Sequence, residues 1–254
     1  MRKWRQFLAM QRTGLTAFCL VWLAAMLAPA LAGPPYQSDD PEPTDYKHFE
    51  IYTFVDGTTG RDGSSGESGI DFNYGAAPNL QLTAVMPAAF DFGSGAAAAG
   101  LGNIELAAKY RFLTQDLAGV DVAFFPRVFL PAASSAVGTQ HASLFLPVWL
   151  EKDWGQWSAF GGGGCELNRG GDDRNFCQTG AVLARQVAPN LQLGLEVFHQ
   201  TPDTLDGAAT TSVGAGVRYD VTDNVHLLGY LARNIQDADA TEPYNWYASI
   251  LFTF

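Results

Sequence analysis

Apolar and polar residues alternate with a period of two along most of the chain. In Tyr244–Phe254 the even positions are apolar or aromatic, while Asn245 and Thr253 stand among the odd ones. Gly102–Phe112 repeats the pattern, with Glu105, Lys109 and Arg111 on the polar side. Successive side chains of a strand point to opposite faces, so this period indicates β-strands with one apolar face. After residue 32 no stretch has the spacing of an amphipathic helix.

The pattern predicts about twelve strands joined by connections of alternating length. Short turns such as Ala76–Asn79 and Thr222–Asp223 alternate with longer stretches such as Asp56–Ser68 and Cys165–Asn175. An even number of strands with this alternation is typical of outer-membrane barrels. We therefore predict an all-β fold, a closed antiparallel up-and-down transmembrane β-barrel over residues 48–254. The expected strands are His48–Val55, Gly69–Gly75, Leu80–Pro87, Leu101–Phe112, Val120–Leu130, Ala142–Glu151, Gln156–Gly164, Phe176–Val187, Leu191–His199, Thr210–Val221, Asn224–Arg233 and Tyr244–Phe254.

The first 47 residues differ from this pattern. Four basic residues precede an uncharged stretch, residues 13–32, which ends in Ala30-Leu31-Ala32. This layout predicts a cleaved signal peptide over residues 1–32. Residues 33–47 are rich in proline and acid, and we expect them to start on the periplasmic side, where they could fold into the barrel mouth as a plug.

Composition narrows the classes of protein. Only 16% of the 254 residues are charged, against about 25% in average soluble domains, while 13% are aromatic. A mean hydropathy of −0.01 excludes a bundle of transmembrane helices. The net charge of −11, which becomes −15 without residues 1–32, argues against a nucleic-acid partner. A soluble β-sandwich is the alternative fold, but its polar face is normally rich in lysine and glutamate.

The polar face of the predicted barrel carries opposed charges. Such a set acts either as an ion-pair network that stiffens a narrow barrel or as a selectivity lining, and both readings stay open. Three aromatic residues on the same face would form apolar steps. The candidate lumen residues are Glu50, Tyr52, Asp71, Glu105, Lys109, Arg111, Asp121, Phe125, Arg127, Phe129, Glu151, Glu196 and Arg218.

Two cysteines remain after removal of the signal peptide. In an exported chain, Cys165 and Cys177 indicate a disulfide, expected in an outer loop. Glu166, Asp172 and Asp173 lie between the two cysteines, but their spacing does not match a calcium-binding loop, and a solvated acidic loop is the simpler interpretation. We expect no metal and no cofactor.

Hydroxyl–histidine pairs are the sequence signal for an enzyme. His141 with Ser143 and His199 with Thr201 lie at predicted outer rims, where a lipid hydrolase would place them. No third, orienting group is evident beside either pair. The chain is therefore expected not to be an enzyme, and a lipid hydrolase is the third alternative.

Three stretches resemble known outer-membrane proteins. The C-terminal strand ending at Phe254 resembles the signal that the barrel-assembly machinery reads. Pro34–Glu50 and Gly102–Phe112 are similar to the opening and an internal strand of a barrel family assigned to transport in the meta-pathway of phenol degradation. This resemblance implies transport of aromatic compounds across the outer membrane, and it brings no catalytic or binding residues.

These observations predict a monomeric barrel in the bacterial outer membrane that forms a narrow channel or facilitator for small molecules, and the resemblance adds aromatic compounds as a class of solute. Its partners would be the solute, outer-membrane lipid and lipopolysaccharide, and the assembly machinery. The alternative is a structural or surface-interaction barrel without a conducting pore.

Overall fold

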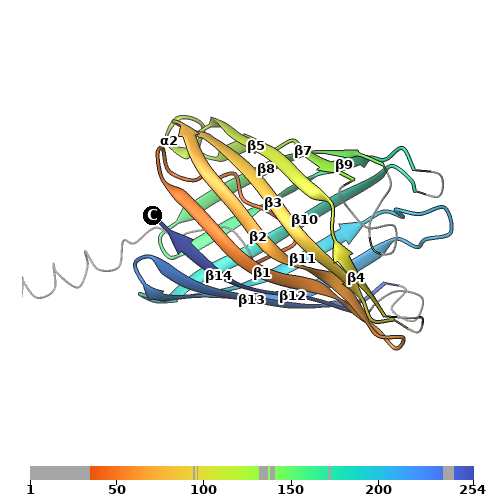
Figure 1. The fold of residues 1–254 in the computed structure, drawn as a ribbon. Coiled ribbons are helices and arrows are strands. Elements are labelled where there is room, and N and C mark those ends of the chain that lie inside the picture. Colours follow the sequence, from red (N-terminus) through yellow and green to blue (C-terminus); the bar gives the residue numbers. More distant parts are fainter. Residues whose placement is uncertain are drawn as a thin grey trace, which may run out of the picture.

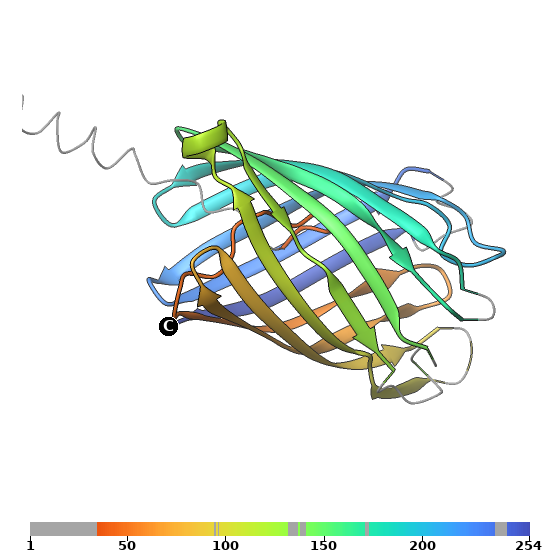
Figure 2. The same ribbon diagram turned by 90° about the horizontal axis from the view of Figure 1, so that it is seen from above.

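The computed structural model is almost entirely β-structure and describes residues 35–93, 95, 97–131, 137, 141–170, 173–236 and 243–254. Its strands form a closed antiparallel barrel, seen along its side in Figure 1 and from a perpendicular direction in Figure 2. The expected fold class is confirmed. The strands are β1 (Phe49–Thr59), β2 (Ser64–Ala77), β3 (Leu80–Asp91), β4 (Ala98–Leu101), β5 (Ile104–Leu113), β6 (Asp121–Phe124), β7 (Arg127–Leu130), β8 (Ser143–Trp154), β9 (Trp157–Leu167), β10 (Phe176–Ala188), β11 (Leu191–Gln200), β12 (Thr210–Thr222), β13 (Val225–Asn234) and β14 (Tyr244–Thr253).

Fourteen segments occupy twelve positions around the ring. β4 and β5 both pair with β3, and β6 and β7 both lie between β5 and β8. The second interruption falls at Pro126, which has no backbone N–H for the ladder. The sequence pattern predicted one uninterrupted strand at each of these two places. The ring closes where β1 pairs with β14, for example Ile51 with Phe252.

Short turns and long connections lie at opposite ends of the barrel. The C-terminus and the short helix α2 (Gln115–Ala118) are at the short-turn end (Figure 1). α2 was not expected from the sequence. The connection between β1 and β2 is only residues 60–63, whereas the sequence pattern predicted a loop over Asp56–Ser68. The two strands therefore reach further than expected, and their serine and glycine residues hid this extension.

The outward face of the barrel is apolar. Leucine, valine and methionine side chains stand exposed at alternate positions of neighbouring strands, for example Met86, Leu106, Leu195, Val197 and Leu231. Exposure of such a surface to water is unfavourable, whereas contact with lipid is favourable. Ring closure also leaves no unpaired sheet edge in the hydrocarbon region. None of the helices among the described residues is long and apolar enough to cross a membrane.

Candidate functional site

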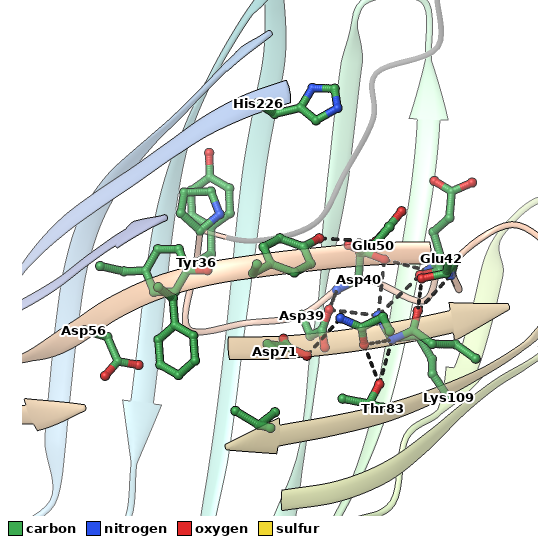
Figure 3. A pocket seen from close by; sticks show the side chains of 18 of the residues that line it. Tyr36, Asp39, Asp40, Glu42, Glu50, Asp56, Asp71, Thr83, Lys109 and His226 are labelled. Carbon is green, nitrogen blue, oxygen red and sulfur yellow. Dashed lines mark hydrogen bonds and ion pairs between the residues drawn. The ribbon is translucent and has the colours of Figure 1, made fainter. Parts of the chain in front are cut away.

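The lumen holds a segment of the chain itself. Residues 35–45 precede β1 and lie inside the barrel, with Ser38, Asp40, Pro41 and Thr44 buried. Beside this segment is a cavity of about 870 Å³, lined both by the segment and by the barrel wall (Figure 3). The candidate site is therefore the remaining lumen together with the segment that narrows it.

Glycines in three adjacent strands make room for the beginning of the segment. A Cβ atom at Gly194 of β11 or Gly216 of β12 would collide with the Tyr36 ring, and one at Gly180 of β10 would collide with the Ser38 hydroxyl. In a strand interior, glycine marks close approach of another group, as it does here.

The Tyr36 ring itself packs against two aromatic residues of the wall. Edge-to-face contacts join it to Phe160 and Tyr230, with ring centroids 5.6 and 5.8 Å apart. Burial raises the pKa of Tyr36, so its phenol stays neutral in the lumen.

Glu196 holds the backbone at the next two residues. Its carboxylate accepts hydrogen bonds from the backbone N–H of Gln37 at 3.1 Å and of Ser38 at 2.6 Å. The Gln37 side chain donates to Ser212 and Tyr230. Glu196 is only 1% exposed, so these bonds to its charged form offset part of the cost of burying it.

Lys109 of β5 binds the acidic centre of the segment. Its Nζ lies 3.0 Å from Asp39 Oδ1 and 3.6 Å from Asp40 Oδ1, and it donates to the Glu42 carbonyl oxygen at 3.3 Å (Figure 3). Burial raises the pKa of Asp40 to about 7, although the Lys109 ammonium opposes that shift. A buried cation is tolerated only when paired, and two acids of the segment supply the pairing.

The segment leaves the lumen at the short-turn end through further polar contacts. The backbone N–H and the hydroxyl of Thr44 both donate to Gln81 Oε1. Arg111 lies 3.8 Å from Glu42 and 3.7 Å from Asp121. Tyr46 then forms a single parallel bridge with Gly75, after which β1 begins. The segment is thus held along its whole described length.

A second ion pair lies in the wall. Arg127 binds Glu105 through two hydrogen bonds of 2.7 and 2.6 Å. Its guanidinium lies 5.7 Å from the centroid of the Phe125 ring and 5.6 Å from that of Phe129. The paired charges and the two rings form one rigid group facing the cavity.

Nine of the thirteen candidate lumen residues line the cavity. Of the other four, Glu196 and Arg111 bind the N-terminal segment, Asp121 pairs with Arg111, and Glu151 accepts a hydrogen bond from Ser158. The nine are Glu50, Tyr52, Asp71, Glu105, Lys109, Phe125, Arg127, Phe129 and Arg218.

Several cavity residues were not predicted from the sequence. Asp56 and Glu67 were expected in an outer loop, but they lie on β1 and β2 and line the cavity. Phe54 and Tyr247 line it too, and neither was among the candidate lumen residues. A signal existed, because residues 50, 52, 54 and 56 share one parity of β1, but the glycines that follow hid the length of the strand.

The expected disulfide is confirmed, and its position differs from the prediction. Cys165 and Cys177 are bonded and face each other in the ladder of β9 and β10 rather than in a loop. Among the described residues no cluster of His, Cys, Asp or Glu has the form of a metal site. Asp172 of the acidic loop lies outside the described residues.

In the second hydroxyl–histidine pair, His199 does not bond to Thr201 but to the hydroxyl of another residue. His199 Nδ1 lies 2.9 Å from Thr211 Oγ1, whereas the Thr201 hydroxyl accepts a hydrogen bond from the backbone of Cys177. Thr211 in turn donates to Gln236. The sequence neighbours His199 and Thr201 therefore serve separate contacts between strands.

Another histidine is part of a polar group near the short-turn end. His226 Nδ1 lies 2.6 Å from Asp220 Oδ1, to which Arg218 Nε also donates at 3.1 Å. His226 is thus a buried, hydrogen-bonded residue of the interior.

Comparison with solved structures identifies the architecture. The COG4313 outer-membrane channel from Pseudomonas putida F1 superposes with a TM-score of 0.65 at 15% identity, covering 88% of this chain and 100% of that one. This is an outer-membrane β-barrel fold. The translocator domain of autotransporter NalP from Neisseria meningitidis gives a TM-score of 0.49 at 13% identity, covering 83% and 88% of the two chains. OccAB2 from Acinetobacter baumannii gives 0.39 at 11% identity, covering 79% and 59%.

No family model matches this sequence, and no curated protein does. The closed ring and its apolar outer face place the protein in the bacterial outer membrane.

Proposed function

We propose that this protein is a narrow channel or facilitator for small molecules in which residues 35–45 form a resident constriction. The observation that carries the proposal is the cavity of about 870 Å³ that remains beside the segment inside a closed barrel. Eight strands fill their own interior with side chains, whereas a ring of twelve leaves space that a solute can cross. The P. putida protein of the same fold is an outer-membrane channel, which supports the proposal.

The charges of the cavity indicate which solutes would pass. Its lining includes ten Asp or Glu residues and three Lys or Arg residues. The three cations are each paired, so the uncompensated charge is negative. A negatively lined constriction favours cations and neutral molecules over anions. Aromatic solutes, which the sequence resemblance implies, remain part of this proposal.

The remaining partners are proposed on the same basis. The apolar outer face would contact outer-membrane lipid and lipopolysaccharide, and the strand ending at Phe254 would be read by the assembly machinery. We propose a monomer, because the ring closes within one chain.

Conductance in planar bilayers tests the proposal. The full barrel is compared with a variant that lacks residues 35–45 but keeps the Tyr46 bridge and all strands. We expect small, cation-preferring conductance for the full barrel and a severalfold larger conductance for the variant. A gel shift between unheated and boiled samples shows that each barrel is folded. If both folded barrels are ion-tight, the channel is refuted and the structural alternative is favoured.

A further inference from the structure

One sector of the cavity combines aromatic rings with carboxylates. On the lumen face, Tyr247 of β14 stands opposite Asp56 of β1, which stands opposite Glu67 of β2. The next inward residue of β1 is Phe54, whose ring is stacked on that of Tyr247 with centroids 6.4 Å apart. Opposite Phe54, β2 carries Gly69 and so has no side chain to cover the ring. All four side-chain-bearing residues line the cavity.

The two carboxylates of this sector have no cation beside them. No described Lys, Arg or His lies within ion-pair distance of Asp56 or Glu67, because the three cavity cations are engaged elsewhere. Like charges directly opposite on neighbouring strands repel each other. Asp56 instead accepts a hydrogen bond from the backbone N–H of Glu67, which fixes the pair side by side.

The sector extends inward by a second, similar row. Tyr52 stands opposite Asp71, and both line the cavity. Asp56 lies four positions after Tyr52 along β1, about 13 Å at the rise of a strand. Asp56 and Asp71 line the same cavity, and both are labelled in Figure 3. A ligand with a ring and a short tail has the length to lie along this sector.

These features match one kind of ligand. The face of an aromatic ring attracts cations, most strongly when water is excluded, and a carboxylate pair adds direct charge attraction. We propose that the sector formed by Phe54, Asp56, Glu67 and Tyr247 binds an organic ammonium ion that carries an aromatic group. This proposal rests on the proposed function, because the site lies in the same lumen. Binding of the ligand is nevertheless measured without any transport assay.

Other ligand classes use only part of the sector. A neutral aromatic molecule gains the rings but leaves the carboxylate pair uncompensated. A small ammonium ion without a ring reaches the carboxylates but buries little apolar surface. An aromatic anion is repelled by both carboxylates. The combination of rings and carboxylates therefore selects for a positive charge and an aromatic ring in one molecule.

Isothermal titration calorimetry of the full chain in detergent tests the proposal with matched probes. The probes are phenethylammonium, 2-phenylethanol, phenylacetate and methylammonium. The first three share an aromatic ring and a similar size, and the first and the last share a positive charge. We expect phenethylammonium to bind at least about tenfold more tightly than each of the other three. Equal binding of 2-phenylethanol, or equal binding of methylammonium, overturns the proposal, as does the absence of binding by phenethylammonium.

Variants locate the site. The double substitution Asp56→Asn with Glu67→Gln keeps shape and removes charge, and we expect it to weaken phenethylammonium binding at least about tenfold. Phe54→Leu is expected to weaken it severalfold. The control removes two exposed acids away from the cavity, Asp116→Asn with Asp206→Asn, and keeps the affinity. Equal effects of the two double variants would assign binding to net charge and overturn the site.

The binding result and the conductance result are independent. A barrel that binds phenethylammonium but is ion-tight retains the site and refutes the channel. A barrel that conducts but does not bind it retains the channel and refutes the site.

Discussion

Replacing Lys109 by methionine removes the cation that holds the N-terminal segment in the lumen. Lys109 is 4% exposed, and its ammonium contacts Asp39, Asp40 and the carbonyl oxygen of Glu42. Methionine fills a similar volume and leaves the barrel wall packed. The substitution therefore acts on the docking of the segment more than on the ring.

The size of the effect follows from the burial of the partners. Breaking a buried ion pair by removing one partner costs about 3–5 kcal/mol, because the other charge stays desolvated. Asp40 is 3% exposed, but the segment can leave the lumen and hydrate its acids, so the loss falls on docking. A loss of about 3 kcal/mol raises the undocked population roughly 100-fold.

Thiol labelling measures that population. Ser38 is 1% exposed and its hydroxyl has no hydrogen-bond partner among the described residues, so Ser38→Cys removes no side-chain bond that the structure describes. Cys165 and Cys177 are bonded to each other and do not react, and the third cysteine, Cys19, is replaced by serine in every variant. Labelling by a maleimide then reports opening of the segment. We expect roughly 100-fold faster labelling when Lys109→Met is added.

Lys152→Met is the matched control, because in the part of the chain that the structure describes this exposed lysine donates only to the carbonyl oxygen of Gly119. It should leave the labelling rate within about twofold of the parent. If Lys109→Met labels no faster than this control while the gel shift shows an intact barrel, the ion pair does not hold the segment.

Three further outcomes follow from the same contacts. Burial raises the pKa of Asp40 from 3.8 to about 7, so the docked segment binds more protons than the free one. Docking should therefore be tightest below about pH 4 and should weaken as the pH rises through about 7. Labelling at Ser38→Cys, normalised to a free thiol, should therefore rise between about pH 5 and pH 8, and a fall would show that charge pairing dominates. Gly194→Val should collide with Tyr36 and speed labelling at least about tenfold without changing the barrel's melting temperature; an unchanged rate would refute close seating. Reducing the Cys165–Cys177 bond should cost at most about 3 kcal/mol and preserve the gel shift, because the β9–β10 ladder already joins the two strands; collapse of the barrel on reduction would contradict this.

The alternation of side chains was enough to predict the barrel. A period of two is a local property, and lipid demands an apolar residue at nearly every outward position, so the pattern survives in short segments. For the same reason Glu105, Lys109 and Glu196 could be assigned to the lumen from parity alone, and the structure places them there. The break of a strand at Pro126 and the extension of β1 past Asp56 were not predicted. Proline, serine and glycine are neither clearly apolar nor clearly charged, so they show no alternating pattern.

The tertiary structure alone decided what the lumen residues contact. Gln37 bonds Tyr230, 193 positions away, and Lys109 meets Asp39 from 70 positions away. Period and spacing describe which face a residue occupies, but not which distant residue stands across the barrel from it. That depends on ring closure and on the course of residues 35–45, which have no repeating pattern. The sequence by itself therefore determined the strands of the barrel wall. Only the tertiary structure determined that residues 35–45 fill part of the lumen, because ring closure creates an interior in which buried acids need hydrogen-bond or ion-pair partners.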